Sequence, residues 1–284
     1  MERFEGKVAV ITGAGSGFGR AFALKAASLG MKLVLADVDE HALAATIEQI
    51  DTPVIGKRTD VSDSVQVDAL AQATFDTFGA AHLLFNNAGV GAGGFVWENS
   101  ANDWQWVFGV NVMGVANGLR AFVPRMIEQG DPAHIVNTAS VAGLLAAPAM
   151  GVYNASKHAV VALTETLYQD LRLAGASIGV SLLCPAFVPT GIADAERSRP
   201  SALANESPYT SSQKLAARQL TRAVESGKLS AQEVADITFD AVREGRFYVI
   251  THPNIMPSVQ LRLDDIAQLR APTDPMSLRR KDAS

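Results

Sequence analysis

VAVITGAGSGFGRAFALKAASLG, residues 8–30, is the stretch of sequence that decides the fold. Its first five residues are a short apolar run, which is typical of a strand buried on both faces of a parallel sheet. From Phe18 to Leu29 apolar residues recur at helical spacing, and Gly30 then ends the pattern. The stretch therefore predicts a strand, a tight glycine-rich turn and a helix.

The turn between this strand and this helix holds four glycines in seven residues. Backbone N–H groups and the positive end of the helix dipole would face a group docked there, which favours an anion. Glycine has no Cβ, so the backbone can approach a pyrophosphate closely. We therefore predict a dinucleotide-binding turn made of Gly13, Gly15, Ser16, Gly17, Phe18 and Gly19.

Composition limits the protein class. The 284 residues, 48% of them hydrophobic, suit one large domain. The net charge of −5 and the lack of a basic block argue against nucleic acid or an anionic membrane as partner. Cys184 is the single cysteine, the first residues lack an apolar signal core, and the longest apolar run is too short to span a bilayer. We expect a cytoplasmic protein.

Strand-like and amphipathic segments alternate along the chain. This order predicts an α/β fold: a Rossmann-like, doubly wound parallel sheet of about seven strands in a single domain over residues 1–270. The predicted strands are 8–12, 33–36, 54–59, 83–85, 134–138, 178–184 and 248–251. The predicted helices are 18–29, 41–50, 65–78, 102–129 with a kink before Pro124, 152–174, 231–244 and 257–269.

Two segments depart from this alternation. Residues 186–229 contain no predicted strand, and so long a connection is typical of a lid, here with a helix at 214–224. Residues 271–284 carry two prolines and mixed charge, so we expect a mobile tail.

Asp37, at the end of the second strand, indicates which dinucleotide binds. A carboxylate there accepts hydrogen bonds from ribose hydroxyls and repels a 2′-phosphate. No Arg or Lys lies between Asp37 and Ile50, and Ser16 is not basic, so we predict NAD rather than NADP. A surface aspartate that caps the next helix is the alternative.

Two later strand ends provide further candidate cofactor contacts. Asp60 and Val61 end the third strand, where they could hold the adenine; a helix-capping role for Asp60 is the alternative. Asn87, Ala88 and Gly89 follow the fourth strand beside the expected cofactor, although a structural turn is an equal alternative for Asn87.

Ser140, Tyr153 and Lys157 are the candidate reactive residues. Ser140 follows the fifth strand, at a carboxyl end where open α/β sheets bind ligands. Tyr153 and Lys157 are four residues apart on a predicted helix and so share one face. A phenol with a pKa of about 10 needs about 4 kcal/mol of stabilisation of its phenolate to act as a base near neutrality. An ammonium about 5 Å away supplies about 3 kcal/mol, so we expect Lys157 to lower the pKa of Tyr153.

With these motifs together, the sequence resembles the short-chain dehydrogenase/reductase family over residues 5–190. The motifs are Thr12-Gly-x-x-x-Gly17-x-Gly19, Asn86-Asn87-Ala88-Gly89, Asn111, Ser140 and Tyr153-x-x-x-Lys157. The resemblance implies hydride transfer between NAD(P) and an alcohol or carbonyl. Tyr153 would be the acid/base, Ser140 would orient the substrate oxygen, Lys157 would bind the nicotinamide ribose, and Asn111 would hold a water of a proton relay.

The resemblance also covers the segment after the sixth strand. The family's Pro-Gly-x-x-x-Thr pattern reads here Pro185-Ala186-Phe187-Val188-Pro189-Thr190, with alanine in place of glycine. It implies that Pro185, Val188 and Thr190 contact the cofactor. It further implies a homodimer or homotetramer formed through the helices at 102–129 and 152–174.

Apolar residues dominate the expected substrate side. They are Val141, Leu144, Leu145, Met150, Phe187 and Ile192, with Phe95 and Trp97 on the loop at residues 91–97. No Arg or Lys stands where it would clamp a carboxylate or phosphate, so we predict a small-molecule secondary alcohol or ketone that is bulky and apolar or aromatic. The same residues alternatively form core and subunit contacts. Residues 248–253 resemble a branch of the family that includes lignin-type aryl alcohol dehydrogenases.

Two other functions remain open alternatives. A non-catalytic NAD-binding regulator or scaffold would share the fold, but such proteins usually lack a complete reactive set. A sugar-nucleotide epimerase or dehydratase would carry a different glycine spacing and a larger C-terminal domain. The five histidines form no pair at metal-ligand spacing, so no metal site is predicted.

Overall fold

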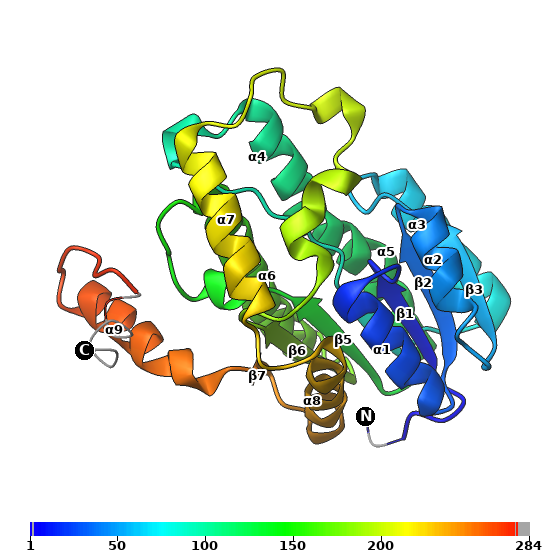
Figure 1. Ribbon diagram of the computed structural model, residues 1–284. Helices are drawn as coiled ribbons and strands as arrows, with labels where there is room; N and C mark the ends of the chain where they lie inside the picture. The colour runs from blue at the N-terminus through cyan, green and yellow to red at the C-terminus, as the bar shows by residue number, and fades with distance from the viewer. Residues whose placement is uncertain (2, 276, 278–284) are drawn as a thin grey trace.

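Seven parallel strands form the centre of the molecule in the order β3-β2-β1-β4-β5-β6-β7 (Figure 1). The computed structural model describes residues 1, 3–275 and 277. All seven predicted strands and the single-domain α/β fold are confirmed. The strands are β1 (Val8–Thr12), β2 (Lys32–Asp37), β3 (Val54–Arg58), β4 (Leu83–Asn86), β5 (Ala133–Thr138), β6 (Ile178–Cys184) and β7 (Tyr248–Ile250).

Helices cover both faces of the sheet because the strands are apolar on both sides. The face that carries Ile11 packs on α1, α2 and α8, and the face that carries Val10 packs on α3, α5 and α6. The helices are α1 (Gly17–Ser28), α2 (Glu40–Ile47), α3 (Ser64–Phe78), α4 (Ala101–Phe108), α5 (Gly114–Gln129), α6 (Gly151–Leu173), α7 (Ser211–Glu225), α8 (Ala231–Glu244) and α9 (Met256–Ala267).

A cluster of aromatic rings fixes α1 on the sheet. Phe22 of α1 is fully buried and stacks on Phe85 of β4, with 4.6 Å between ring centroids. Phe239 of α8 lies 5.6 Å from the Phe85 ring on the same face. Burial of each such side chain stabilises the fold by about 1.5–3 kcal/mol. The start of α1, and with it the glycine turn, is thereby held at the carboxyl end of β1.

The helix predicted at 102–129 is divided in two. A π-helical turn, Gly109–Met113, separates α4 from α5, and α5 continues through Pro124. The departure from α geometry therefore lies earlier than the predicted kink. By length and composition the whole segment, Ala101–Gln129, could cross a membrane, but half of its apolar window is buried inside the protein, as in a core helix of a soluble protein.

The long connection after β6 contains two short 3₁₀ helices, Gly191–Ser198 and Ser201–Leu203, and then α7. We call residues 191–205 the strap. The predicted helix at 214–224 is confirmed as α7. Of the predicted tail, Thr273 N–H donates to Asp265 and Pro275 C=O accepts from Ser258, so this part contacts α9; residues 276 and 278–284 lie outside the described residues.

Candidate functional site

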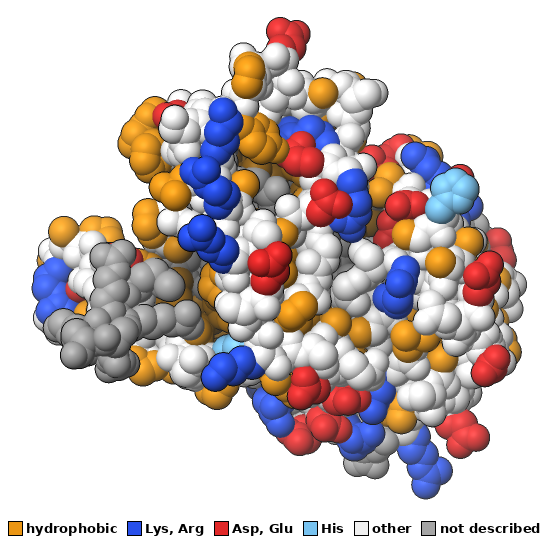
Figure 2. All heavy atoms as spheres, in the orientation of Figure 1, with side chains coloured by type: hydrophobic (Ala, Val, Ile, Leu, Met, Phe, Trp, Pro, Cys, Tyr) orange, Lys and Arg blue, Asp and Glu red, His pale blue; other side chains and the backbone are white. Residues whose placement is uncertain are grey.

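A cavity of about 880 Å³ lies at the carboxyl ends of the strands. The glycine turn and Asp37 line one end, Ser140, Tyr153 and Lys157 line the middle, and the strap and α7 close the other side. Figure 2 shows the surface over this region, with a row of basic side chains along α7. The volume suits a ligand as large as a dinucleotide with a small substrate.

The glycine turn has the backbone that an anion site needs. Gly13 and Gly17 adopt left-handed φ values of 67° and 52°. Helix α1 has no acidic residue in its first turn, and Ser16 makes no side-chain cap, so neither supplies an anion to the N–H groups of that turn; the Asp37 carboxylate binds Gly15 N–H, one residue before the cap. A Cβ on Gly19 would lie 1.9 Å from Gly13 O, which explains why glycine is needed there. These features fit the phosphates of a dinucleotide.

Asp37 is fixed beside this turn. Its carboxylate accepts hydrogen bonds from the N–H groups of Gly15, at 2.8 Å, and Asp39, at 3.0 Å. The cap of α2 is Asp39, whose side chain accepts from Ala42 N–H, so the alternative capping role does not fall to Asp37. Arg58 of β3 pairs in register with Asp37 and also lines the cavity. Sequence reasoning overlooked Arg58, which only the strand register places beside Asp37.

Asp60 and Val61 lie at the next strand end and line the cavity. The Asp60 carboxylate accepts from Ser62 N–H and Oγ, whereas Asp63 caps α3. Val61 C=O accepts from Asn117 of α5, which ties this edge of the cavity to the helix layer that α3 and α5 share.

Asn87 joins β4 to β1. Its side-chain amide donates to Thr12 C=O at 2.9 Å, and Thr12 Oγ1 accepts from the N–H groups of Asn87 and Ala88. Gly89 follows, and a Cβ there would lie 3.5 Å from Lys157 Nζ. The segment thus shapes the cavity floor next to the reactive residues.

Ser140, Tyr153 and Lys157 are brought together in the cavity wall. Ser140 hydrogen-bonds Tyr153, and its Oγ accepts from Ala142 N–H at 3.1 Å. The buried Lys157 ammonium donates to Thr138 C=O at 2.9 Å and lies 5.7 Å from the Tyr153 ring centroid. Three elements, β5, the loop after it and α6, therefore converge on one polar cluster.

The predicted lowering of the Tyr153 pKa by Lys157 is not seen. Burial raises the pKa of Tyr153, and only the hydrogen bond from Ser140 lowers it. Burial also lowers the pKa of Lys157 to about 8. The Lys157 ammonium faces the Thr138 carbonyl. Tyr153 and Lys157 both lie in a wall that excludes water, and burial there disfavours the charged form of each side chain more than their attraction favours it.

Asn111 lies in the π-helical turn, behind this wall. Its side chain is buried and makes hydrogen bonds with Val90 N–H and C=O and with Ser156 Oγ, at 2.8–2.9 Å. Asn111 does not line the cavity, and neither do Gly15 and Gly19. The other predicted site residues do: Gly13, Ser16, Gly17, Phe18, Asp37, Asp60, Val61, Asn87, Ala88, Gly89, Ser140, Tyr153, Lys157, Pro185, Val188 and Thr190.

The segment after β6 reaches both ends of the cavity. Pro185 C=O accepts from Val141 N–H at 3.0 Å, next to Ser140. Thr190 packs against the glycine turn, where a Cβ on Gly17 would lie 3.3 Å from Thr190 Cβ. Val188 is buried in the core that carries α1.

Five of the apolar residues expected on the substrate side line the cavity: Val141, Leu145, Met150, Phe187 and Ile192. Leu144 instead packs into the core beside α6, and Phe95 and Trp97 stack on each other away from the cavity, with Trp97 80% exposed. Trp106 of α4 adds an aromatic face that the sequence analysis overlooked.

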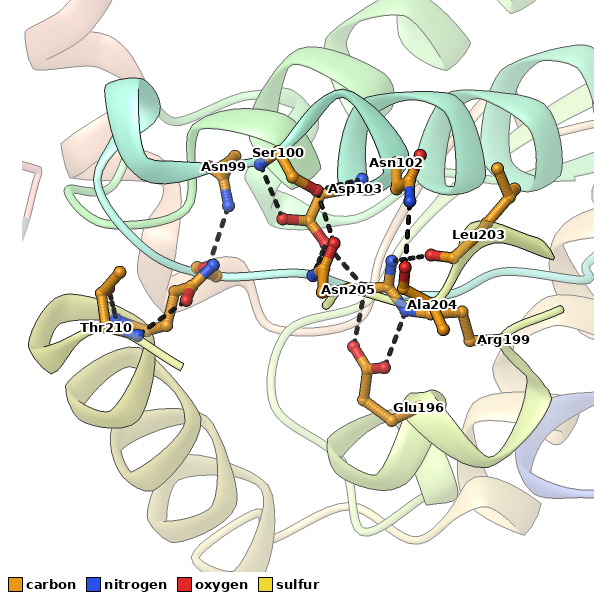
Figure 3. A network of polar contacts seen from close by, with 12 residues as sticks. Asn99, Ser100, Asn102, Asp103, Glu196, Arg199, Leu203, Ala204, Asn205 and Thr210 are labelled. Carbon is orange, nitrogen blue, oxygen red and sulfur yellow. Dashed lines mark hydrogen bonds and ion pairs between the residues drawn. The ribbon is translucent and has the colours of Figure 1, made fainter. Parts of the chain in front are cut away.

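The sequence indicated no Arg or Lys placed to clamp a carboxylate or phosphate, but the structure brings Arg58, Arg197 and Arg199 to the cavity lining in addition to the predicted Lys157. Arg199 donates to Asp103 of α4 and to both carboxylate oxygens of Glu196 (Figure 3). Its guanidinium carbon also lies 4.1 Å from the Trp106 ring centroid. The Arg199 and Asp103 side chains are only 6% and 3% exposed. Asn205 also donates to Asp103, so the strap is tied to α4.

Among the residues that the structure describes, no group of three or more His, Cys, Asp or Glu is arranged to hold a metal ion. Cys184 is buried at the end of β6, where it packs as a small apolar side chain.

Comparison with known proteins gives strong matches. A family model described as short chain dehydrogenase matches residues 7–201. A crystal structure of a short chain dehydrogenase/reductase from Burkholderia phymatum in complex with NAD is 68% identical, with a TM-score of 0.96, and the match covers 98% of this chain and 100% of that one.

Two curated relatives match almost the whole chain. One is named CLA biosynthesis dehydrogenase/reductase, from Lactiplantibacillus plantarum, and is 36% identical over 277 residues, 96% of this chain and 97% of the relative. The other is named C alpha-dehydrogenase, from Sphingobium sp. strain NBRC 103272 / SYK-6, and is 32% identical over 287 residues, 99% and 92% of the two chains. The fold, the cavity and these matches identify an oxidoreductase that acts on CH–OH groups, and the chain belongs to the short-chain dehydrogenase family.

Proposed function

We propose that the protein is an NAD-dependent oxidoreductase that interconverts a secondary alcohol and its ketone, with Tyr153 as the acid/base. The observation that carries this proposal is the convergence of Ser140, Tyr153 and Lys157 on one cavity with the glycine turn and Asp37. The NAD complex of the 68% identical relative supports the choice of cofactor.

The residues of this chain divide the work between binding and proton transfer. The glycine turn and Asp37 would hold the phosphates and the adenosine ribose, and a bound nicotinamide would supply the hydride acceptor or donor. Ser140 is oriented by Ala142 N–H so that its hydroxyl can also hold the substrate oxygen. Because burial raises its pKa, Tyr153 is protonated at neutral pH, the form that gives a proton to a ketone oxygen.

NAD is proposed over NADP because the Asp37 carboxylate would repel a 2′-phosphate. Two backbone N–H groups hold the Asp37 carboxylate in place, and moving it away from a 2′-phosphate would break both hydrogen bonds. Arg58 in the neighbouring strand, which also lines the cavity, favours NADP instead.

For the substrate we propose a bulky apolar or aromatic secondary alcohol. Five apolar side chains and Trp106 line the space around Ser140 and Tyr153. The charge of Arg199 is neutralised by Asp103 and Glu196, which leaves it unsuited to clamp a charged substrate. A panel of NAD-linked oxidations tests this; faster turnover of small charged hydroxy acids than of aryl or alicyclic carbinols would refute it.

Replacing Tyr153 by Phe tests the proposed chemistry. We expect turnover to fall by about 10³-fold because the proton donor is lost, while the Kd for NAD measured by calorimetry changes less than about twofold. Tyr168→Phe on the same helix is the matched control, since the Tyr168 hydroxyl contacts only exposed Arg172 among the described hydrogen bonds. A Tyr153→Phe variant with full turnover would contradict the role of Tyr153 as the acid/base, whereas an unaltered protein that binds NAD without any turnover would support the scaffold alternative.

A cytoplasmic location and assembly into a homodimer or homotetramer remain predictions from the sequence and the family. Helices α5 and α6 would form the interface. Light scattering on the purified protein measures the assembly directly, and a monomer at micromolar concentration would contradict the prediction.

A further inference from the structure

Two arginines of the strap lie two residues apart and reach opposite ends of the cavity. Arg199 is tied to α4, as described above. Arg197 reaches the glycine turn, where its Nη2 donates to Ser16 Oγ at 3.3 Å, across 181 positions of sequence. Nothing in the established family membership assigns a role to Arg197.

The Arg197 guanidinium is held in place from its own side of the cavity. Its Nη1 donates to Gly191 C=O at 2.8 Å and to Asp194 C=O at 2.7 Å, which braces the first 3₁₀ helix of the strap. The side chain remains 42% exposed, and the Asp194 carboxylate is 3.9 Å away. These bonds fix the guanidinium so that Arg197 Nη2 points toward the glycine turn.

The position of the Arg197 guanidinium favours the binding of an anion next to it. Arg197 lies beside the N-terminus of α1, which is the positive end of the helix dipole, and two positive groups side by side repel. The first turn of α1 contains no acidic residue, and Ser16 caps it with no side-chain hydrogen bond. A phosphate between them would satisfy both, because guanidinium forks and helix N–H groups are matched to phosphate oxygens.

We propose that Arg197 of the strap binds the pyrophosphate of the dinucleotide. Cofactor binding would then hold the strap against the glycine turn. This rests on the proposed NAD dependence. The buried link between Arg199 and Asp103 holds the other end of the strap on α4, which positions Arg197 before the cofactor arrives.

Binding measurements test the proposal without reference to turnover. Arg197→Ala should raise the Kd of both NAD and ADP-ribose, which share the pyrophosphate, by about tenfold, because a charge-assisted contact at a half-exposed site is lost. The Kd of adenosine, from competition titration, should stay within about twofold. Arg197→Lys should fall between the two, since lysine keeps the charge but not the planar fork.

Arg218→Ala is the matched control, because Arg218 is exposed on α7 and removal of its charge should leave all three affinities unchanged. The affinity difference between the Arg197→Ala variant and the unaltered protein should also shrink as salt rises from 50 to 500 mM, a range of about tenfold in screening ions.

The outcomes separate this proposal from the proposed function. If the unaltered protein binds NAD and Arg197→Ala binds NAD and ADP-ribose equally well, the Arg197 proposal alone is overturned. Equal losses for adenosine and ADP-ribose would assign Arg197 a structural role and also overturn it. An unaltered protein that fails to bind NAD would overturn both proposals.

Discussion

The glycine turn and the strap face the same cavity, yet different forces hold them. The turn rests on α1, which the buried Phe22 ring fixes against Phe85 of the sheet. The strap is tied down by Arg199, Asp103 and the polar groups around them (Figure 3). Apolar packing is shared by the whole core and is lost only when the domain unfolds, whereas a polar link at the edge can open locally. We therefore expect two walls of one cavity, the glycine turn and the strap, to differ in how easily they open.

The largest expected effect comes from breaking the apolar support. Phe22→Ala should lower the free energy of unfolding by about 3–5 kcal/mol, because it leaves a cavity beneath the glycine turn. Urea unfolding measures the loss. The control is Phe95→Ala, at a side chain that is exposed, where the change should stay within about 0.5 kcal/mol. A loss below 1 kcal/mol for Phe22→Ala would show that α1 is not held by this ring.

Breaking the polar link should act on the strap and on the start of α4, where Asp103 also accepts from Ser100 N–H, but not on α1. Asp103→Asn removes one charge from a buried ion pair, and we expect local opening to become easier by about 2–3 kcal/mol, since Glu196 still pairs with Arg199. Hydrogen exchange followed by mass spectrometry should speed up over residues 196–205 and stay unchanged over α1.

Asp240→Asn is the control for that experiment, because Asp240 pairs with Arg243 at an exposed site where such pairs contribute little. Equal acceleration in α1 and in the strap would contradict the distinction between the two regions.

Lowering the pH should have a smaller effect: it should destabilise the core around β5 but leave the polar link of the strap intact. Burial lowers the pKa of His134 in β5 to about 3 from 6.5, so the unfolded chain binds this proton more tightly and stability falls as the pH drops from about 6.5 toward 3. Burial raises the pKa of Asp103, but hydrogen bonds from Asn205, Ser100 and Arg199 outweigh it and the net pKa is lowered, so the strap link stays charged at pH 5.5.

Between pH 7 and 5.5 we expect His134 to account for about 1.2 kcal/mol of lost stability. Urea unfolding at the two pH values should show this loss in the unaltered protein and a smaller one in His134→Gln, while exchange over residues 196–205 relative to the global opening stays constant. An identical pH dependence in His134→Gln would refute the assignment, whatever the contributions of other groups.

The parts of the fold that sequence predicted are those with local signals. Continuous apolar runs gave the seven strands, and the glycine spacing gave the turn before α1. The Tyr153 and Lys157 spacing placed both on one face of α6, which lines the cavity. The helix at 102–129 was predicted with a kink before Pro124 because proline is a clear breaker, whereas the π-helical turn Gly109–Met113 has no residue signature that marks it in the sequence.

The parts that sequence could not provide depend on long-range geometry. Arg197 and Arg199 sit in a stretch without periodicity, and only the folded strap sends one to the glycine turn and the other to α4. The pKa of Tyr153 depends on how deeply the wall is buried, which residue spacing does not reveal. Likewise, the aromatic residues Phe95 and Trp97 resemble pocket residues in sequence but stack on the surface.

The register of β2 and β3, which pairs Asp37 with Arg58, bears on which coenzyme the cavity can accept. In-register residues of parallel strands point to the same side, so a carboxylate and a guanidinium stand next to each other at one edge of the cavity. The Asp37 carboxylate would repel the 2′-phosphate of a phosphorylated ribose, whereas the Arg58 guanidinium would attract it. If the proposed NAD dependence holds, position 37 is therefore where a substitution would first alter the coenzyme preference.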